Sequence, residues 1–390
     1  MQYDFDKTLN RRQTNSLKWD VAENELPMWV ADMDFATAPQ ISEALSRRVQ
    51  HGVYGYSVIP DSWYDAIISW WQRRHGFEID KSWLQFCTGV VPAISCLVQR
   101  LTNVGDNVAV LTPVYDIFFH SIENFGRHTL ECALVYRNGK YSIDFDALER
   151  ALEDPLTTML IFCNPHNPTG TVWSREELAK IGALCKKHGV VVLSDEIHCD
   201  LTLPGIDYVP FASVSADCAE NIITCISASK AFNLAGLQSA AVFVPNKHLR
   251  EVVVRALNSC EIAEPNCFAI DGIVAAFNEG EQWLDELRAY LAENRRIVAE
   301  FLHKNLPQVR LVEGQATYLL WIDCAAYTRD SAKLRDFIAQ HTGLILSAGS
   351  QYRGNGNTFL RMNVACSRER LTDGLNRFAT ALKAYRELEK

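Results

Sequence analysis

A lysine follows a short apolar run in the segment SASKAFNLAG, residues 227–236, where it is the fourth residue after the run ends. The run 222–226 is typical of a buried strand, and Ser227 and Ser229 place two hydroxyl groups beside Lys230. A lysine amine that is withdrawn from water has a lowered pKa and becomes nucleophilic, which is what Schiff-base chemistry requires. A solvated loop lysine is the alternative for Lys230 taken alone, because lysine is seldom buried without a partner.

An acid follows another apolar run. In VVVLSDEIH, Asp195 comes at the carboxyl end of a presumed central strand, and ligands of open α/β sheets bind at that edge. A buried carboxylate there needs a cationic partner, and a protonated pyridine nitrogen would be one. An ordinary helix N-cap or turn acid is the alternative for Asp195 taken alone.

Further candidates follow other predicted strands. Asn167, in NPHNPTG (164–170), could donate a hydrogen bond to a ligand oxygen, although the prolines and glycine could equally form a structural turn. Tyr115, after strand 107–112, could stack on a flat ring. Arg361, in the alternating strand TFLRMNVA, could grip a carboxylate with two parallel hydrogen bonds.

The segment CTGVVPAISCLVQRL (87–101) runs through Gly89 into a predicted helix, whose free N–H groups would form an anion site. It has neither the Walker nor the Rossmann glycine pattern, so this signal is weak by itself. Together, these candidates match what pyridoxal 5′-phosphate needs to handle an amino acid: a lysine, a carboxylate, a stacking aromatic ring, a phosphate site and a group that binds the substrate carboxylate.

The elements that must position these residues alternate between strands and helices. Between two of the strands, SREELAKIGALCKKHG has a capping box formed by Ser174 and Glu177, and it ends at Gly189. This alternation predicts an α/β fold with a mostly parallel central sheet flanked by helices. The predicted strands cover residues 107–112, 157–164, 190–196, 221–227 and 239–244.

The flanks of the chain have a different pattern. Residues 1–38 are predicted to form an extended arm, and 281–305 a long helix. Strands at 316–323 and 358–365, with helices at 331–341 and 368–388, predict a second, smaller α/β unit. We therefore predict an arm with part of the small domain (1–45), a large cofactor-binding domain (46–285) and a small C-terminal domain (286–390).

Composition excludes several function classes. The 390 residues carry 38 basic and 47 acidic side chains, a net charge of −9 that repels nucleic acid. No stretch approaches the roughly 18 apolar residues of a membrane span, and the start of the chain lacks the apolar region of a signal peptide. Twelve cysteines without a C-x-x-C pair disfavour zinc and thioredoxin-type sites and suit a reducing cytoplasm.

The order Y…NPxNPTG…SDEIH…SxSK…R resembles the fold-type I pyridoxal-phosphate enzymes, the aspartate aminotransferase superfamily, over essentially the whole chain. More narrowly, the chain resembles the MalY/PatB-type cystathionine β-lyases, also called C–S lyases. The stretches that carry this resemblance are VADMDFATAP (30–39), HGVYGYS (51–57), SDEIHCDL (194–201) and SASKAFNLAGLQ (227–238).

The resemblance implies a role for each candidate. Lys230 would hold the cofactor covalently and later move the Cα proton, and Asp195 would pair with the ring nitrogen. Arg361 would bind the substrate α-carboxylate. Tyr56 is similar to the family tyrosine that reaches the neighbouring subunit's cofactor, which implies a homodimer with shared active sites. The remaining cofactor contacts would be Asn167 to the 3′ oxygen, Tyr115 stacking on the ring, and Ser227, Ser229, Gly89 and Val90 at the phosphate.

One position departs from the general aminotransferase pattern. Those enzymes usually carry a tyrosine three residues after the ring aspartate, whereas this chain has His198. The departure favours the lyase branch, and we predict that His198 binds the cofactor.

Three hypotheses about function follow. The leading one is β-elimination from L-cystathionine or a related cysteine S-conjugate, which yields a thiol, pyruvate and ammonia. An aminotransferase on the same scaffold is the second. The third is a regulator that uses the cofactor structurally, which the complete set of catalytic residues and the absence of a basic helix-turn-helix pattern both disfavour.

Overall fold

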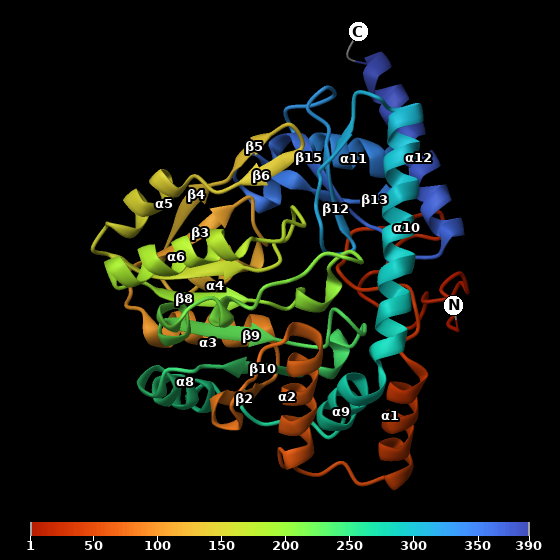
Figure 1. Cartoon of the computed structure of the whole chain (residues 1–390). Helices are drawn as coiled ribbons and strands as arrows, with labels where there is room; N and C mark the ends of the chain where they lie inside the picture. The colour runs from red at the N-terminus through yellow and green to blue at the C-terminus, as the bar shows by residue number, and fades with distance from the viewer. Residues whose placement is uncertain (1, 389–390) are drawn as a thin grey trace.

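A seven-stranded sheet forms the centre of the computed structural model, which describes residues 2–388 (Figure 1). Every neighbouring pair is parallel except the two pairs that involve β10, which is antiparallel to both of its neighbours. The predicted mostly parallel α/β sheet is therefore confirmed. In spatial order the strands are β2 (Leu84–Cys87), β10 (Ala240–Phe243), β9 (Ile222–Ile226), β8 (Val191–Asp195), β7 (Thr157–Cys163), β3 (Asn107–Thr112) and β4 (His128–Ala133).

Both faces of this sheet are buried, which is why its strands are apolar runs. Successive side chains of a strand point to opposite faces. In β3, Val108 and Val110 belong to one hydrophobic cluster, and Ala109 and Leu111 belong to the other. The first cluster includes residues of α3 (Val90–Leu101), α4 (Ile117–Glu123) and α8 (Lys247–Ser259). The second includes residues of α1 (Pro39–His51), α2 (Asp61–His75), α5 (Phe145–Leu152), α6 (Arg175–His188), α7 (Ala216–Glu220) and α9 (Ala269–Glu279).

Helix α6 begins and ends as its sequence predicts. The Ser174 hydroxyl accepts a hydrogen bond from the Glu177 amide at 3.2 Å, and the Glu177 carboxylate accepts one from the Ser174 amide at 2.8 Å. Gly189 ends the helix with a φ of 69°, a left-handed conformation that glycine adopts without steric cost.

A second sheet of four strands lies beside the first and has its own hydrophobic core. Figure 1 shows α10 (Glu281–Asn305) running along one side of the molecule, from the region of α1 and α9 to that of α12 (Arg368–Leu388). The division at residue 285 stays a prediction, and it falls within α10. The four strands are β11 (Arg310–Leu311), β12 (Leu319–Asp323), β15 (Phe359–Asn363) and β14 (Ser347–Ala348), packed with α11 (Ser331–Thr342).

Two smaller pairings complete the architecture. Strand β1 (Leu26–Pro27) of the N-terminal arm pairs in parallel with β13 (Leu344–Ile345), which attaches the arm to the second unit. Strands β5 (Val135–Arg137) and β6 (Lys140–Ser142) form a hairpin. All twelve cysteines are free, and ten of them are buried. Within residues 2–388, each helix is too short or too polar to cross a membrane.

A buried ion network fixes the arm. Lys18 and Asp34 are almost inaccessible, with side-chain exposures of 1% and 2%, and Lys18 Nζ lies 3.2 Å from Asp34 Oδ1. Arg11 contacts the same oxygen at 2.8 Å, and the Trp19 indole donates to it at 2.9 Å. Burial by itself raises the pKa of Asp34, but the charge of Lys18, the Trp19 hydrogen bond and the nearby arginines outweigh burial, so the pKa is lowered.

We predict that Asp34→Asn lowers the free energy of unfolding by about 3 kcal/mol, because it removes the nearer of the two carboxylates that pair with the buried Lys18 ammonium and leaves only Asp32, at 3.6 Å. Urea unfolding followed by tryptophan fluorescence measures the loss. The control is Asp20→Asn, an exposed acid of the same arm, which should change stability by less than about 0.5 kcal/mol. Equal stabilities for the two variants would contradict this account of the network.

Candidate active site

The carboxyl ends of five strands meet at one edge of the large sheet. Strands β2, β3, β7, β8 and β9 run in the same direction, so the residues after them gather there. They surround a cavity of about 260 Å³. The predicted site residues that line it are Gly89, Val90, Tyr115, Asn167, Asp195, His198, Ser227, Ser229 and Lys230.

Lys230 lines this cavity together with the other predicted site residues. Its Nζ donates a hydrogen bond of 2.8 Å to the carbonyl oxygen of Ala31, in the N-terminal arm. Burial, and then the nearby charge of Arg361, lower the pKa of Lys230 to about 8 against the opposing effect of Asp32 and Asp195. A sizeable fraction of the amine is therefore neutral, and nucleophilic, at slightly alkaline pH.

Asp195 ends β8 with a side chain that is nearly inaccessible. Its Oδ1 accepts a hydrogen bond of 3.1 Å from the amide of Ile197. Burial raises the pKa of Asp195 to about 6, although that amide and the charge of Lys230 both act to lower it. A carboxyl group in this state would be stabilised as a carboxylate by a cationic nitrogen placed against it in the cavity.

His198 and Tyr115 bring neutral groups to the cavity. Burial lowers the pKa of His198 to about 3, helped by the charges of Lys230 and Arg361, so the imidazole is uncharged. Its buried Nδ1 has no hydrogen-bond partner among residues 2–388. Burial raises the pKa of Tyr115, so the phenol also stays neutral. The free Nδ1 of His198 is suited to a polar group of a ligand.

The cavity also has the donors of an anion site. Helix α3 begins there at Val90, after Gly89, and no side chain caps it, so the first amides of the helix are available to a ligand. The Ser227 hydroxyl donates to the carbonyl of Ser239 at 2.7 Å and accepts from the amide of Ser229 at 3.0 Å. Ser227 therefore shapes the loop, and both Ser227 and Ser229 line the cavity.

Arg361 reaches this region from the second sheet. Its two terminal nitrogens donate to Asn167 Oδ1 at 3.2 Å and to the carbonyl of Trp29 at 3.0 Å. The guanidinium lies over the ring of Tyr352, with 5.0 Å between them, and Arg361 Nε has no partner within residues 2–388. This fixed, buried guanidinium could bind a carboxylate beside Asn167.

Sequence reasoning missed the residues that hold the arm against Lys230. The Tyr318 hydroxyl donates to the same carbonyl of Ala31 at 3.0 Å, and the Asn363 side-chain amide donates to the carbonyls of Val30 and Asp32. Asn363 follows Arg361 by two residues in β15, so strand periodicity places both on one face. That spacing could have identified Asn363. The backbone carbonyls carry no comparable signal in the sequence.

The structure does not bring Tyr56 into the cavity of its own chain. Tyr56 is fully exposed, on the loop between α1 and α2. Its predicted contact with a neighbouring subunit's cofactor therefore stays a prediction.

The donors of the cavity fit pyridoxal 5′-phosphate. The partly neutral amine of Lys230 suits the aldehyde, and the buried carboxyl group of Asp195 suits the ring nitrogen. The uncapped start of α3 suits the phosphate, and the unpartnered nitrogen of His198 suits a polar substituent of the ring. Lys230, Asp195, Gly89 and Ser229 would hold the group.

Comparison with known proteins extends this result beyond the site. A model of the family described as "Aminotransferase class I and II" matches residues 25–378. Cystathionine beta-lyase PatB of Bacillus subtilis is 43% identical over 97% of this chain and 99% of its own length. Protein MalY of Escherichia coli is 33% identical over 98% of this chain and its full length.

Solved structures agree with the sequence comparison. The pyridoxal-phosphate-bound C–S lyase of Staphylococcus hominis superposes with a TM-score of 0.92, with 34% identity over 98% of each chain. The chain therefore belongs to the class I and II aminotransferases, a pyridoxal-phosphate-dependent family, and within it to the branch of PatB and MalY.

Proposed function

We propose that the protein cleaves the carbon–sulfur bond of L-cystathionine, or of a related cysteine S-conjugate, by α,β-elimination. With cystathionine and water, the products are homocysteine, pyruvate and ammonia. The observation that carries the proposal is the convergence of Lys230, Asp195 and Arg361 in a chain 43% identical to a cystathionine β-lyase.

Each side chain has a task that its environment supports. When bound, pyridoxal phosphate supplies a covalent link to the substrate amine and a sink for the electrons of the Cα–H bond. Arg361 binds the α-carboxylate, which orients the Cα–H bond toward Lys230. The neutral form of the Lys230 amine then removes the Cα proton as a general base, and the thiol leaves from Cβ. Asp195 stabilises the protonated ring nitrogen by charge.

The aminotransferase alternative uses the same residues and ends differently. An aminotransferase returns the proton to a carbon atom of the cofactor and keeps the Cβ–sulfur bond intact. Two observations favour the lyase: the C–S lyase relatives, and the neutral His198 at the position where aminotransferases usually carry a tyrosine.

A paired assay tests the proposal. The purified holoenzyme is incubated with L-cystathionine alone, and pyruvate and free thiol are measured. In parallel it receives amino donors and 2-oxoglutarate, and glutamate is measured. Equal amounts of pyruvate and thiol without an oxo acid are expected. Glutamate formation with little thiol release would instead assign the protein to the aminotransferases.

We predict that Lys230→Ala lowers turnover by at least roughly 10³-fold, because it removes the general base and the covalent anchor of the cofactor. The fold should persist, as judged by circular dichroism. Borohydride treatment followed by mass spectrometry should attach the cofactor to Lys230 in the unmodified chain. Lys247→Ala, an exposed lysine at the start of α8, is the control that should keep full activity. Robust turnover by the Lys230 variant would contradict the assignment.

We further propose a homodimer in which the loop 52–60 contacts the second copy. Several apolar side chains of this loop are exposed: Val53 by 62%, Val58 by 79% and Tyr56 completely. Adjacent exposed apolar groups mark interaction surfaces. The family resemblance implies that Tyr56 reaches the partner's cofactor, and we propose that its hydroxyl donates a hydrogen bond to the phosphate. Twelve free cysteines also support a reducing, cytoplasmic setting.

Tyr56→Phe is therefore expected to weaken cofactor retention by roughly tenfold or more, the loss of one hydrogen bond to a charged group. Dialysis of the holoenzyme, followed by the cofactor's absorbance, measures the release. Tyr54→Phe is the matched control, because Tyr54 is also exposed on this loop but donates to the Val49 carbonyl of its own chain. Equal retention by both variants would count against the shared site.

A further inference from the structure

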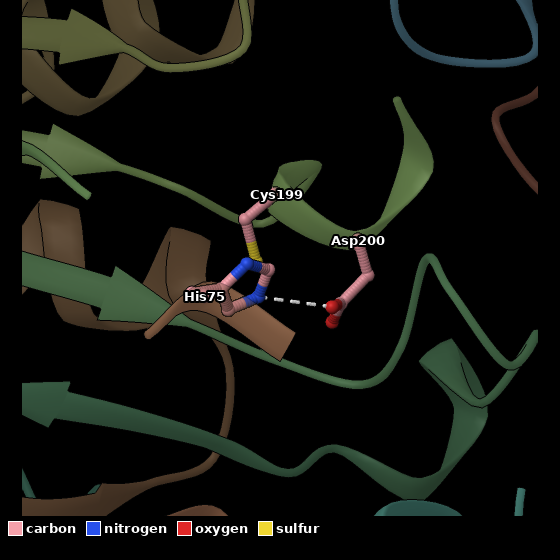
Figure 2. Close-up of side chains that lie close together, drawn as sticks. All are labelled: His75, Cys199 and Asp200. Carbon is pink, nitrogen blue, oxygen red and sulfur yellow. Dashed lines mark ion pairs between the residues drawn. The ribbon is translucent and has the colours of Figure 1, made fainter. Parts of the chain in front are cut away.

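Three side chains with metal-ligating atoms converge outside the cofactor cavity. His75 is the last residue of α2, and Cys199 and Asp200 belong to the short helix η2 (Cys199–Leu201). Figure 2 shows them pointing toward one another from these two elements. One ring nitrogen of His75, the sulfur of Cys199 and a carboxylate oxygen of Asp200 all lie within 4.8 Å of one another. We call these residues the α2–η2 cluster.

The cluster is held in place by its surroundings. The His75 ring packs edge to face against Trp71 and Tyr208, with centroid separations of 4.9 and 5.0 Å. The Trp70 indole donates to the two oxygens of Asp200 at 3.0 and 3.2 Å. Outer contacts of this kind orient metal ligands and fix their geometry.

The hydrogen bonding within the cluster is incomplete. His75 Nε2 lies 3.0 Å from Asp200 Oδ1, but the pair lacks hydrogen-bond geometry. The His75 side chain is 6% exposed, and Nε2 has no hydrogen-bond partner within residues 2–388. Buried polar atoms are usually satisfied, so this nitrogen is suited to a ligand. Two atoms bound to zinc at about 2.0 Å in tetrahedral geometry lie about 3.3 Å apart, close to the observed separation.

The chemistry of the three groups selects the ion. Imidazole nitrogen, thiolate and carboxylate are the ligands that Zn²⁺ takes, and three protein ligands leave a fourth position open. A cavity of about 430 Å³ adjoins the cluster and gives that position access to water. Magnesium and calcium prefer oxygen ligands alone, so the thiol argues against both.

Charge balance is compatible with a cation here. Arg73, Arg74 and Arg288 also line the cavity, but they pair with Glu281 and Asp285. A thiol binds Zn²⁺ as the thiolate, so binding through Cys199 would release its proton. Zn²⁺ with one thiolate, one carboxylate and a neutral imidazole forms a centre of zero net charge, which lowers its burial cost.

We propose that the α2–η2 cluster binds Zn²⁺ through His75, Cys199 and Asp200, with water or an anion from the adjoining cavity as the fourth ligand. The ion would tie α2 to the segment that carries the cofactor site, because His198 directly precedes η2 and lines the cofactor cavity. The proposal is independent of the reaction that the enzyme catalyses.

The test titrates chelator-treated holoenzyme with Zn²⁺ in a calorimeter and with Co²⁺ in a spectrophotometer. Equimolar Zn²⁺ binding with release of a proton is expected, together with a Co²⁺–thiolate charge-transfer band in the difference spectrum. Cys199→Ser should abolish this band and weaken Zn²⁺ binding by at least roughly 100-fold, because loss of an outer-shell partner alone costs roughly 10- to 100-fold. Cys260→Ser, which removes a partly buried thiol elsewhere, is the matched control and should retain both.

The results of the metal titration either support or overturn the proposed zinc site. Failure of the unmodified holoenzyme to bind an equivalent of Zn²⁺ would overturn the proposal, as would a thiolate band that survives Cys199→Ser. Melting in the presence of chelator, with circular dichroism, establishes that each variant folds. If Cys199→Ser does not fold, His75→Gln replaces it, and undiminished Zn²⁺ affinity in that variant would equally overturn the site.

Discussion

The partial burial of the Lys230 amine is the constraint on which the site depends. A buried ammonium group is unfavourable unless polar groups surround it, and the direct contact of Nζ is a backbone carbonyl, that of Ala31. That carbonyl belongs to the N-terminal arm, which reaches Lys230 because Tyr318 and Asn363 hold its backbone and the Lys18–Asp34 pair anchors it. The reactivity of one amine therefore rests on contacts made by parts of the chain that are far apart in sequence.

The parallel sheet positions the other polar groups of the site. The segments that follow the strands at the common edge each contribute between one and three polar residues to the cavity. The second sheet adds Arg361 from another direction, and its contact with Asn167 joins the two units at the site. An amino-acid substrate would thus be held between groups from both units, its reacting carbon beside Lys230.

Much of this arrangement could be predicted from the sequence, for physical reasons. Strands buried on both faces must be apolar throughout, so β3, β7, β8 and β9 were recognisable, and Asp195 and Lys230 stood out at their ends. Contacts made by backbone carbonyl groups, such as that of Ala31, do not depend on the residue type, so the sequence does not reveal them. The α2–η2 cluster was equally hidden, because His75 and Cys199 are brought together by the fold and have no motif spacing. The surroundings of Tyr56 depend on a second chain, which no single sequence describes.

The continuity of α10 has a mechanical consequence. Near its start, Trp283 and Leu284 pack into the large core, and towards its end Val298 and Leu302 pack into the core of the second unit. Its 25 residues form a rod about 38 Å long that is clamped at both ends. Sliding of one unit past the other would break packing at one of the clamps, whereas bending or twisting of the rod would keep both. The stiffness of a single helix therefore limits how far Arg361 can travel relative to Lys230.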